Sequence, residues 1–161
     1  MTATNTKPVY GPEAALVKAR AYCVYQERSH QELRDKLYEW GQHQKDVEAI
    51  ISELITSGFI NEERFAITYA GGKFRIKKWG KVKIKMGLKE KRVSDYCIRK
   101  ALSAIDMDDY IRTLKEILES KAASVKESNL LKKKYKVAQY AVSRGFESDL
   151  VWEVLEKDAL L

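Results

Sequence analysis

The chain has 161 residues, which is enough for one ordinary domain or a short array of small repeats. Hydrophobic residues make up 45% and charged residues 33% of the composition, and the formal net charge is +7, so we expect a globular protein with much charged surface. No stretch approaches the ~20 apolar residues of a membrane helix, and no secretory signal is recognised at the start, so we expect a cytoplasmic protein.

A disordered tail is predicted for residues 1–12, and a first helix follows over about residues 12–26. Its apolar positions recur with the helical period at Ala15, Leu16, Ala19, Tyr22 and Cys23. Ser29 and Glu32 then fit a capping box, because the hydroxyl can accept from the third N–H while the carboxylate reaches back. The second helix is predicted to end at Gly41, a natural left-handed cap.

A third helix is predicted over about residues 45–57, ended by Gly58, and it completes a three-helix unit. The unit recurs at offsets of 51 and then 53 residues. Four apolar positions are matched in both later copies: Leu33, Ile84 and Val137; Leu37, Leu88 and Ala141; Val47, Ile98 and Val151; Ile51, Leu102 and Leu155. The turn residue Gly41 is matched by Arg92 and then by Gly145.

We therefore predict an all-α fold of three tandem three-helix repeats in an elongated array, which offers a long surface rather than a deep catalytic pocket. The predicted repeats cover residues 13–60, 61–106 and 107–161. In the second repeat, Gly71 and Gly72 are expected to kink or shorten the first helix. Residues 74–84 alternate partly like a strand, but the repeat pattern favours helix from Lys81 onward.

Positive charge is concentrated in residues 73–92, which carry +9 and leave −2 for the rest of the chain. Such a patch suits an anionic polymer or an acidic protein surface, and the alternative is a solvated lysine face. A helical wheel places five cations within one quadrant: Lys78, Lys81, Lys85, Lys89 and Arg92. We expect packed surface on both sides of this stripe, with Val82 and Met86 on one side and Ile84 and Leu88 on the other. The stripe suits sequence-independent contact with a phosphate backbone.

Three neighbouring features allow two interpretations each. Trp79 either stacks on a base or belongs to the core. The pair of helices over residues 80–102 has the form of a helix-turn-helix unit, although short helix pairs serve many purposes. A smaller basic cluster either extends the binding surface or keeps its helix soluble: Lys132, Lys133, Lys134 and Lys136.

The sequence contains no pattern typical of a catalytic or metal site. His30 and His43 have no second ligand at metal-site spacing. Glycine patterns of nucleotide-binding loops and a Ser–His–Asp arrangement are absent. Cys23 and Cys97 are isolated among apolar residues, which favours reduced, buried cysteines. We therefore expect neither an enzyme nor a cofactor or metal.

The order of motifs resembles the RecX regulatory family over roughly residues 14–155. The most specific motif is Gly-Phe-Ile-Asn-Glu-Glu-Arg-Phe-Ala at residues 58–66. It is preceded by the capped helix that begins after Ser29, and it is followed by Gly80-Lys-Val-Lys-Ile and by Arg144-Gly-Phe. Two departures are visible: Asn61 stands where the family usually has Asp, and Arg92 stands where it often has Gly, which is expected to change that turn.

The resemblance implies three-helix repeats that are related to winged-helix units. It also implies a cytoplasmic modulator of the recombinase RecA, and this modulator binds RecA filaments in their helical groove. Such proteins inhibit strand exchange and ATP turnover, and many also bind DNA. The family motif also has a structural interpretation, with Asn61 as a helix cap, Phe65 and Ala66 packed between modules, and Arg64 as the one surface contact.

Three hypotheses follow: a RecA modulator, a sequence-independent DNA-binding protein without a recombinase partner, or a purely structural helical adaptor. We expect a monomer that binds the RecA filament and single- or double-stranded DNA, with no membrane partner. The candidate contacts are Lys73, Arg75, Lys77, Lys78, Lys81, Lys85, Lys89, Arg92 and Arg64, with the smaller cluster Lys132, Lys133, Lys134 and Lys136 as a second set.

Overall fold

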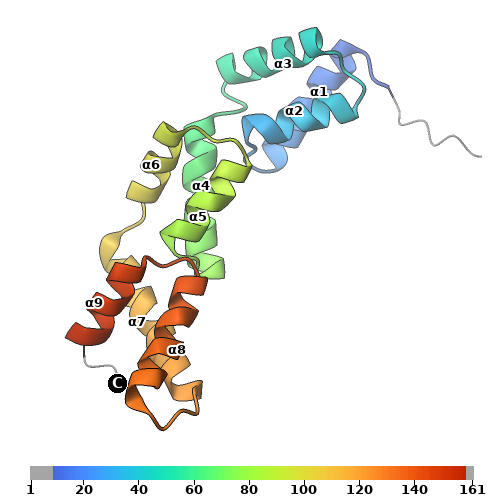
Figure 1. The fold of residues 1–161 in the computed structure, drawn as a ribbon. Coiled ribbons are helices and arrows are strands. Elements are labelled where there is room, and N and C mark those ends of the chain that lie inside the picture. Colours follow the sequence, from blue (N-terminus) through green and yellow to red (C-terminus); the bar gives the residue numbers. More distant parts are fainter. Residues whose placement is uncertain (1–8, 159–161) are drawn as a thin grey trace, which may run out of the picture.

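The computed structural model describes residues 9–158, which form nine α-helices and no strand (Figure 1). The helices are α1 (Pro12–Tyr25), α2 (His30–Glu39), α3 (Gln44–Thr56), α4 (Glu62–Lys77), α5 (Lys81–Glu90), α6 (Asp95–Ser103), α7 (Met107–Ser124), α8 (Leu130–Ser143) and α9 (Ser148–Lys157). We call α1–α3 module 1, α4–α6 module 2 and α7–α9 module 3. The modules follow one another along an elongated array, so the predicted all-α class and tandem arrangement are confirmed.

The predicted capping box at the start of α2 is present. The Ser29 hydroxyl accepts from the Glu32 N–H at 3.0 Å, and the Glu32 carboxylate accepts from the Ser29 N–H at 3.0 Å. Leu33 and Leu37 on the same helix are fully buried. Two of the unpaired donors at the helix start are thus satisfied while the apolar face enters the core.

The second helix of each module ends in the same hydrogen-bonded turn. Its left-handed residue is Gly41, Arg92 or Gly145, with φ of 86°, 56° and 99°. In each copy this residue donates to the carbonyl three positions earlier, at 3.0, 2.9 and 2.9 Å respectively. The expectation that Arg92 changes the turn is therefore wrong, because the same hydrogen bonds hold an arginine in the left-handed region at a cost of about 1–2 kcal/mol.

The helix α4 runs through Gly71 and Gly72 without interruption, so the expected shortening at these glycines is wrong. It is held by burial on both sides of the pair, since Ala70 and Phe74 both enter the core. The chain leaves α4 at Lys78, which is left-handed with φ of 55°, and α5 begins at Lys81. The choice of helix over strand from Lys81 onward is confirmed.

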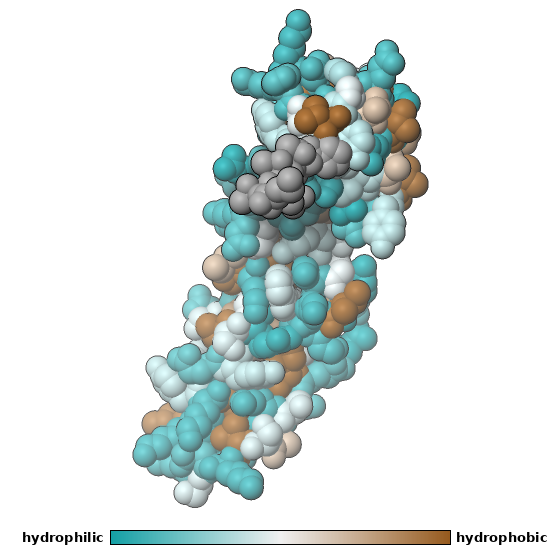
Figure 2. All heavy atoms as spheres, turned by 90° about the vertical axis from the view of Figure 1, so that its right-hand side faces the viewer, coloured by the Kyte–Doolittle hydropathy of each residue, from teal (hydrophilic) through white to brown (hydrophobic). Residues whose placement is uncertain are grey.

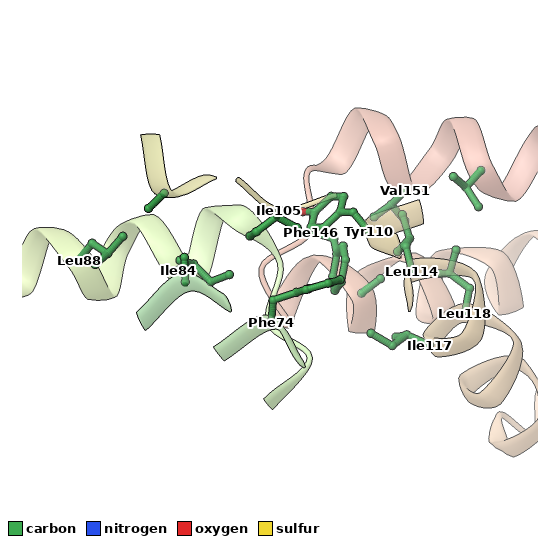
Figure 3. Packing of buried hydrophobic residues seen from close by; sticks show 14 of the residues in the cluster. Phe74, Ile84, Leu88, Ile105, Tyr110, Leu114, Ile117, Leu118, Phe146 and Val151 are labelled. Atoms are coloured by element: carbon green, nitrogen blue, oxygen red, sulfur yellow. The ribbon is translucent and has the colours of Figure 1, made fainter. Parts of the chain in front are cut away.

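Module 1 has a hydrophobic core of its own, whereas modules 2 and 3 share one. At the centre of the shared core, Tyr110 of α7 packs between Phe74 of α4 and Phe146 before α9, with ring centroids 5.7 and 5.0 Å apart (Figure 3). Ile105 and Leu114 lie beside these rings. Modules 2 and 3 are therefore one packed unit, to which module 1 is attached.

Residues 1–8 of the predicted tail lie outside the described residues, and the adjoining segment is tied to module 1. The Tyr10 N–H donates to the Trp40 carbonyl at 3.2 Å, and the Tyr10 carbonyl accepts from the Gln42 side chain at 2.5 Å. Val9 lies against Gly41. None of the helices between residues 9 and 158 is both long and apolar enough to cross a membrane.

Candidate binding surface

Three of the predicted cations are exposed on α5 or directly after it, and we call them the α5 edge: Lys85 and Lys89 on the helix, and Arg92 in the turn that follows. Within residues 9–158, no carboxylate lies at ion-pair distance from any of the three. Ile84 and Leu88 on the opposite side of the helix are fully buried, so the rotation of α5 about its axis is fixed. Lys85 and Lys89 therefore project from the exposed side of α5, where their ammonium groups can meet an anion.

The exposed side of α5 also carries an apolar ridge. Val82 is 47% and Met86 is 60% exposed, so the prediction that packed surface borders the stripe on both sides is wrong on this side. The reason is that α5 packs on α4 and α6 through the face that holds Ile84 and Leu88, whereas it contacts module 3 at its first turn. The α5 edge thus lies beside apolar surface that a partner can cover.

Lys81 has a different environment, because it is half-buried at the contact between modules 2 and 3. Its backbone N–H donates to the Tyr110 hydroxyl at 2.9 Å, and its ammonium lies 5.0 Å from the centre of that ring. The Tyr110 hydroxyl in turn donates to the Glu147 carboxylate. Burial, and then this carboxylate, hold the pKa of Tyr110 well above its usual value, so the phenol stays protonated as a donor. Lys81 therefore positions the start of α5.

The remaining predicted cations of the basic segment lie on other surfaces. Lys73 lies over Tyr69 and Trp79, Arg75 lines a cavity with Asp106 and Asp109, and Lys78 lines another with Glu116 and Arg144. Lys77 is exposed, and its carbonyl accepts from the Arg144 guanidinium. The prediction that Lys78 and Arg92 share one quadrant of a helix with the lysines of α5 is wrong. Both residues lie outside α5, so the helical periodicity does not fix their direction.

Arg64 is held in place by its own contacts. Its guanidinium pairs with Glu27 at 2.5 Å and donates to the carbonyls of Gly58 and Phe59 at 3.2 and 3.4 Å. Asn61 caps α4 by accepting from the Arg64 N–H at 2.8 Å, as predicted. The geometry therefore gives Arg64 a role in joining module 1 to module 2, instead of the free surface contact expected from the sequence.

The junction between modules 2 and 3 is built from backbone contacts. The Gly80 N–H donates to the Arg144 carbonyl at 2.9 Å, and the Val82 N–H donates to the Gly145 carbonyl at 2.9 Å. A Cβ atom on Gly80 would lie 2.2 Å from the carbonyl carbon of Gly145, so the approach requires glycine. The two family motifs that contain Gly80 and Gly145 are thus one contact.

The equivalent junction between modules 1 and 2 is built from side chains. The repeat offsets place Ser29 where module 2 has Gly80, and Arg92 where module 3 has Gly145. Between the described residues of these two segments there is no backbone hydrogen bond, and the Lys91 ammonium pairs with Glu32 at 2.5 Å instead. The repeat alignment shows the loss of both glycines at this junction, but no local sequence pattern indicates Glu27 and Glu32 as the ion-pair partners.

The smaller basic cluster lies in the first turns of α8. Lys132 and Lys136 are exposed, whereas Lys133 and Lys134 are half-buried. Lys136 pairs with Glu127 at 3.0 Å, and this hydrogen bond lowers the pKa of the Glu127 carboxyl. Part of the cluster is therefore already neutralised within module 3. Across the described stretch of chain, no group of three or more His, Cys, Asp or Glu side chains is arranged to hold a metal ion.

Comparison with known families gives three matches in chain order. The RecX first three-helix domain matches residues 15–54, the RecX second three-helix domain matches residues 61–102, and the RecX third three-helix domain matches residues 108–155. These matches cover most of the chain and follow the three modules of the structure.

Curated relatives and solved structures agree with these matches. The chain is 34% identical to the regulatory protein RecX of Clostridium acetobutylicum over 134 residues, which are 81% of this chain and 62% of that protein. It is 26% identical to the regulatory protein RecX of Bacillus mycoides over 145 residues, which are 90% of this chain and 54% of that protein. The chain thus spans less than two thirds of the length of either relative. The crystal structure of RecX from Lactobacillus salivarius superposes with a TM-score of 0.86 at 23% identity, over 93% of this chain and 97% of that one, and so shares the fold.

Proposed function

Because this chain belongs to the RecX family of regulatory proteins, we propose that it binds the recombinase RecA assembled on single-stranded DNA and inhibits its strand exchange and ATP hydrolysis. The observation that carries the proposal is the succession of all three RecX domains along one chain. In this proposal the protein acts in the cytoplasm as a regulator and not as an enzyme.

The geometry supports a contact along a filament. An elongated array can touch several points of a helical polymer at once, whereas a compact domain of the same length touches fewer. The α5 edge lies in the middle module, carries three cations that have no acidic partner among residues 9–158, and adjoins the apolar ridge of Val82 and Met86. Cations beside apolar surface suit a nucleoprotein partner, whose surface is both anionic and proteinaceous.

The first test is RecA ATP hydrolysis on single-stranded DNA, measured with this protein at substoichiometric amounts. We expect strong inhibition by the unaltered protein. The double variant Lys85→Glu/Lys89→Glu should need a concentration roughly tenfold higher for half-inhibition, because two fixed attractive charges become repulsive. Both side chains are exposed and form no ion pair within residues 9–158, so the fold should be unaffected.

A matched control is Lys45→Glu/Arg99→Glu, which makes the same change of charge at exposed positions on α3 and α6. The control should inhibit like the unaltered protein. If the unaltered protein leaves ATP hydrolysis unchanged, the proposal is wrong. If both double variants weaken inhibition equally, net charge matters and the α5 edge is not the contact.

A second candidate function is sequence-independent DNA binding without a recombinase partner. The observation that favours it is the α5 edge itself, because exposed cations with no acidic partner in the described part of the chain suit phosphates whether or not a recombinase is bound. In that case the affinity for DNA alone falls steeply with salt while RecA hydrolyses ATP at its normal rate.

A further inference from the structure

The far end of module 3 carries apolar and basic side chains that the packing of the module does not use. Leu130 is 56%, Leu131 is 71% and Tyr135 is 58% exposed. Residues 121–136 hold six lysines and one glutamate, so this short segment carries a net charge of +5. We call the following residues the module 3 tip: Lys126, Leu130, Leu131, Lys132, Lys133, Lys134 and Tyr135.

The module 3 tip is one patch, because its residues belong to one turn and to the first two turns of one helix. Residues 125–129 join α7 to α8 at the lower end of the array, and α8 begins there (Figure 1). Two helical turns span about 11 Å, and helical side chains lean toward the N-terminus of their helix. The leucines and lysines therefore lean toward this end of the molecule. Figure 2 shows apolar surface among hydrophilic surface at the same lower end.

Aromatic side chains extend this patch toward α9. Tyr135 lies on the same side of α8 as Leu131, because the two residues are four positions apart. The Tyr135 ring centroid is 5.6 Å from that of Trp152, which is half-buried against the shared core. Tyrosine and tryptophan are enriched at the level of the lipid headgroups in membrane proteins. The patch thus combines exposed leucines, an aromatic pair and cations.

The lysines of the module 3 tip do not stabilise the protein itself. Seven of the nine helices between residues 9 and 158 have an acidic residue in the first turn, where it suits the helix dipole, whereas α8 has none and begins Leu-Leu-Lys-Lys-Lys. Lys136 pairs with Glu127 at 3.0 Å. Among the described residues, no carboxylate lies at ion-pair distance from the four other lysines of the segment 126–136. A solubilising role would explain these charges but not the two exposed leucines beside them.

We propose that the module 3 tip docks on the surface of an anionic lipid bilayer, with Leu130 and Leu131 at the boundary of the acyl chains and the lysines at the lipid phosphates. Leucine side chains leave water when they enter hydrocarbon, whereas the phosphates of a nucleic acid offer charge without an apolar layer. The lysines match the negative potential of such a bilayer. This peripheral contact needs no membrane-spanning helix, and it is a membrane partner that the sequence analysis did not expect.

The test is sedimentation of the full chain with vesicles, in the absence of RecA and DNA. Vesicles of equal parts phosphatidylglycerol and phosphatidylcholine are compared with vesicles of phosphatidylcholine alone. We expect at least roughly tenfold stronger partitioning into the anionic vesicles, because several lysines face the charged surface. Equal partitioning into both, or binding to neither, would overturn the proposal. Since RecA is absent, either result leaves the function proposed above untouched.

A leucine variant tests the apolar part of the contact. Leu130→Ser/Leu131→Ser keeps every charge and should lower partitioning into the anionic vesicles roughly tenfold, because two apolar side chains no longer leave water. The matched control is Val17→Ser/Val24→Ser, which removes two exposed apolar side chains from α1 in module 1 and should partition like the unaltered protein. Circular dichroism checks that both variants are folded. Unchanged partitioning of the leucine variant, or an equal loss in the control, would contradict the proposal.

A lysine variant tests the charged part and does not depend on how the leucine variant folds. Lys126→Gln/Lys132→Gln changes two exposed side chains and should also lower partitioning roughly tenfold, with a weaker dependence on salt. Lys45→Gln/Arg99→Gln removes the same charge elsewhere and should have little effect. Equal losses in the two variants would mean that net charge alone drives the binding, which would contradict the proposal.

Nucleic acid is the alternative partner for this patch, and the leucine variant separates the two. Its affinity for a duplex oligodeoxynucleotide, measured without vesicles, should equal that of the unaltered protein, because phosphates offer the leucines no apolar layer. A loss of affinity for the duplex together with unchanged partitioning into vesicles would assign the module 3 tip to nucleic acid and overturn the proposal.

Discussion

Arg92 occupies a backbone conformation that Gly41 and Gly145 reach without strain. Its turn is maintained by the same two hydrogen bonds as in the other modules, with Val93 N–H donating to the Leu88 carbonyl at 3.1 Å. Unlike Gly145, Arg92 meets no backbone of a neighbouring module at hydrogen-bond distance among the described residues. A side chain is therefore tolerated there, and its charge is added to the α5 edge.

Replacing this arginine by glycine should stabilise the protein by about 0.5–1 kcal/mol, because relief of left-handed strain exceeds the added entropy of the unfolded chain. Urea unfolding followed by circular dichroism measures the change. Arg92→Ala is the matched control, since it removes the same charge but keeps Cβ, and its stability should be close to that of the unaltered protein. If the glycine variant is less stable than the alanine variant, the left-handed backbone at position 92 does not strain the folded protein.

Some residues of the candidate surface were predictable and others were not, for a reason visible in their contacts. The exposure of Lys85 and Lys89 follows from helical phase once Ile84 and Leu88 are taken as core. The ion pair of Arg64 with Glu27 does not follow from helical phase, because Glu27 lies 37 residues earlier in the chain. Likewise, the direction of the Lys78 side chain does not follow from helical phase, because Lys78 is the left-handed residue that ends α4.

At the scale of elements, the two junctions differ in what holds them. Gly80 allows two backbone hydrogen bonds to module 3, whereas Ser29 and Arg92 leave the equivalent junction to ion pairs. Glu32 takes part twice, since one carboxylate oxygen pairs with Lys91 while the other accepts from the Ser29 N–H. Ion pairs between partly exposed side chains are weak and screened by salt, so module 1 is the less firmly attached.

Lys91→Met should loosen this junction while leaving the capping box of α2 intact. We expect a broader distribution of distances between spin labels at exposed positions 45 and 99, which lie on α3 and α6. The unaltered protein should approach the same distribution in about 1 M salt, where the screening length is about 3 Å. Lys115→Met is the control, because it breaks an ion pair with Asp158 inside module 3. Identical distributions for all proteins and salts would mean that the ion pairs do not hold the junction.

At the scale of the whole molecule, the separate cores divide the array into unequal parts. Ala15 to Ile60 enclose the core of module 1, and Phe65 to Leu155 enclose the core that modules 2 and 3 share. Tyr110 lies at the centre of the shared core and contacts rings from both modules. Cooperative unfolding follows shared apolar packing, so the molecule should open in two steps.

Native-state hydrogen exchange in increasing urea checks this expectation. The amides of α1–α3 should converge on one opening free energy, and those of the core helices of modules 2 and 3 on a second, higher one. The core shared by modules 2 and 3 is the larger one, so its opening exposes more apolar surface and should have the higher free energy. A single opening free energy for all three modules would show that the junction ion pairs couple the two cores fully.

The sequence by itself determined what depends on local periodicity. The all-α repeat pattern, the capping box at Ser29, the turns at Gly41 and Gly145 and buried positions such as Leu33 and Leu155 follow from residues within one or two helical turns, repeated at a nearly fixed offset. The turn at Arg92 and the unbroken α4 did not follow from that pattern. Only the tertiary structure decided which of the basic residues remain free. Lys81 contacts Tyr110, Arg64 pairs with Glu27, and Lys91 pairs with Glu32. These partners lie far apart in the sequence and meet where the modules pack, so no local sequence pattern predicts the contacts.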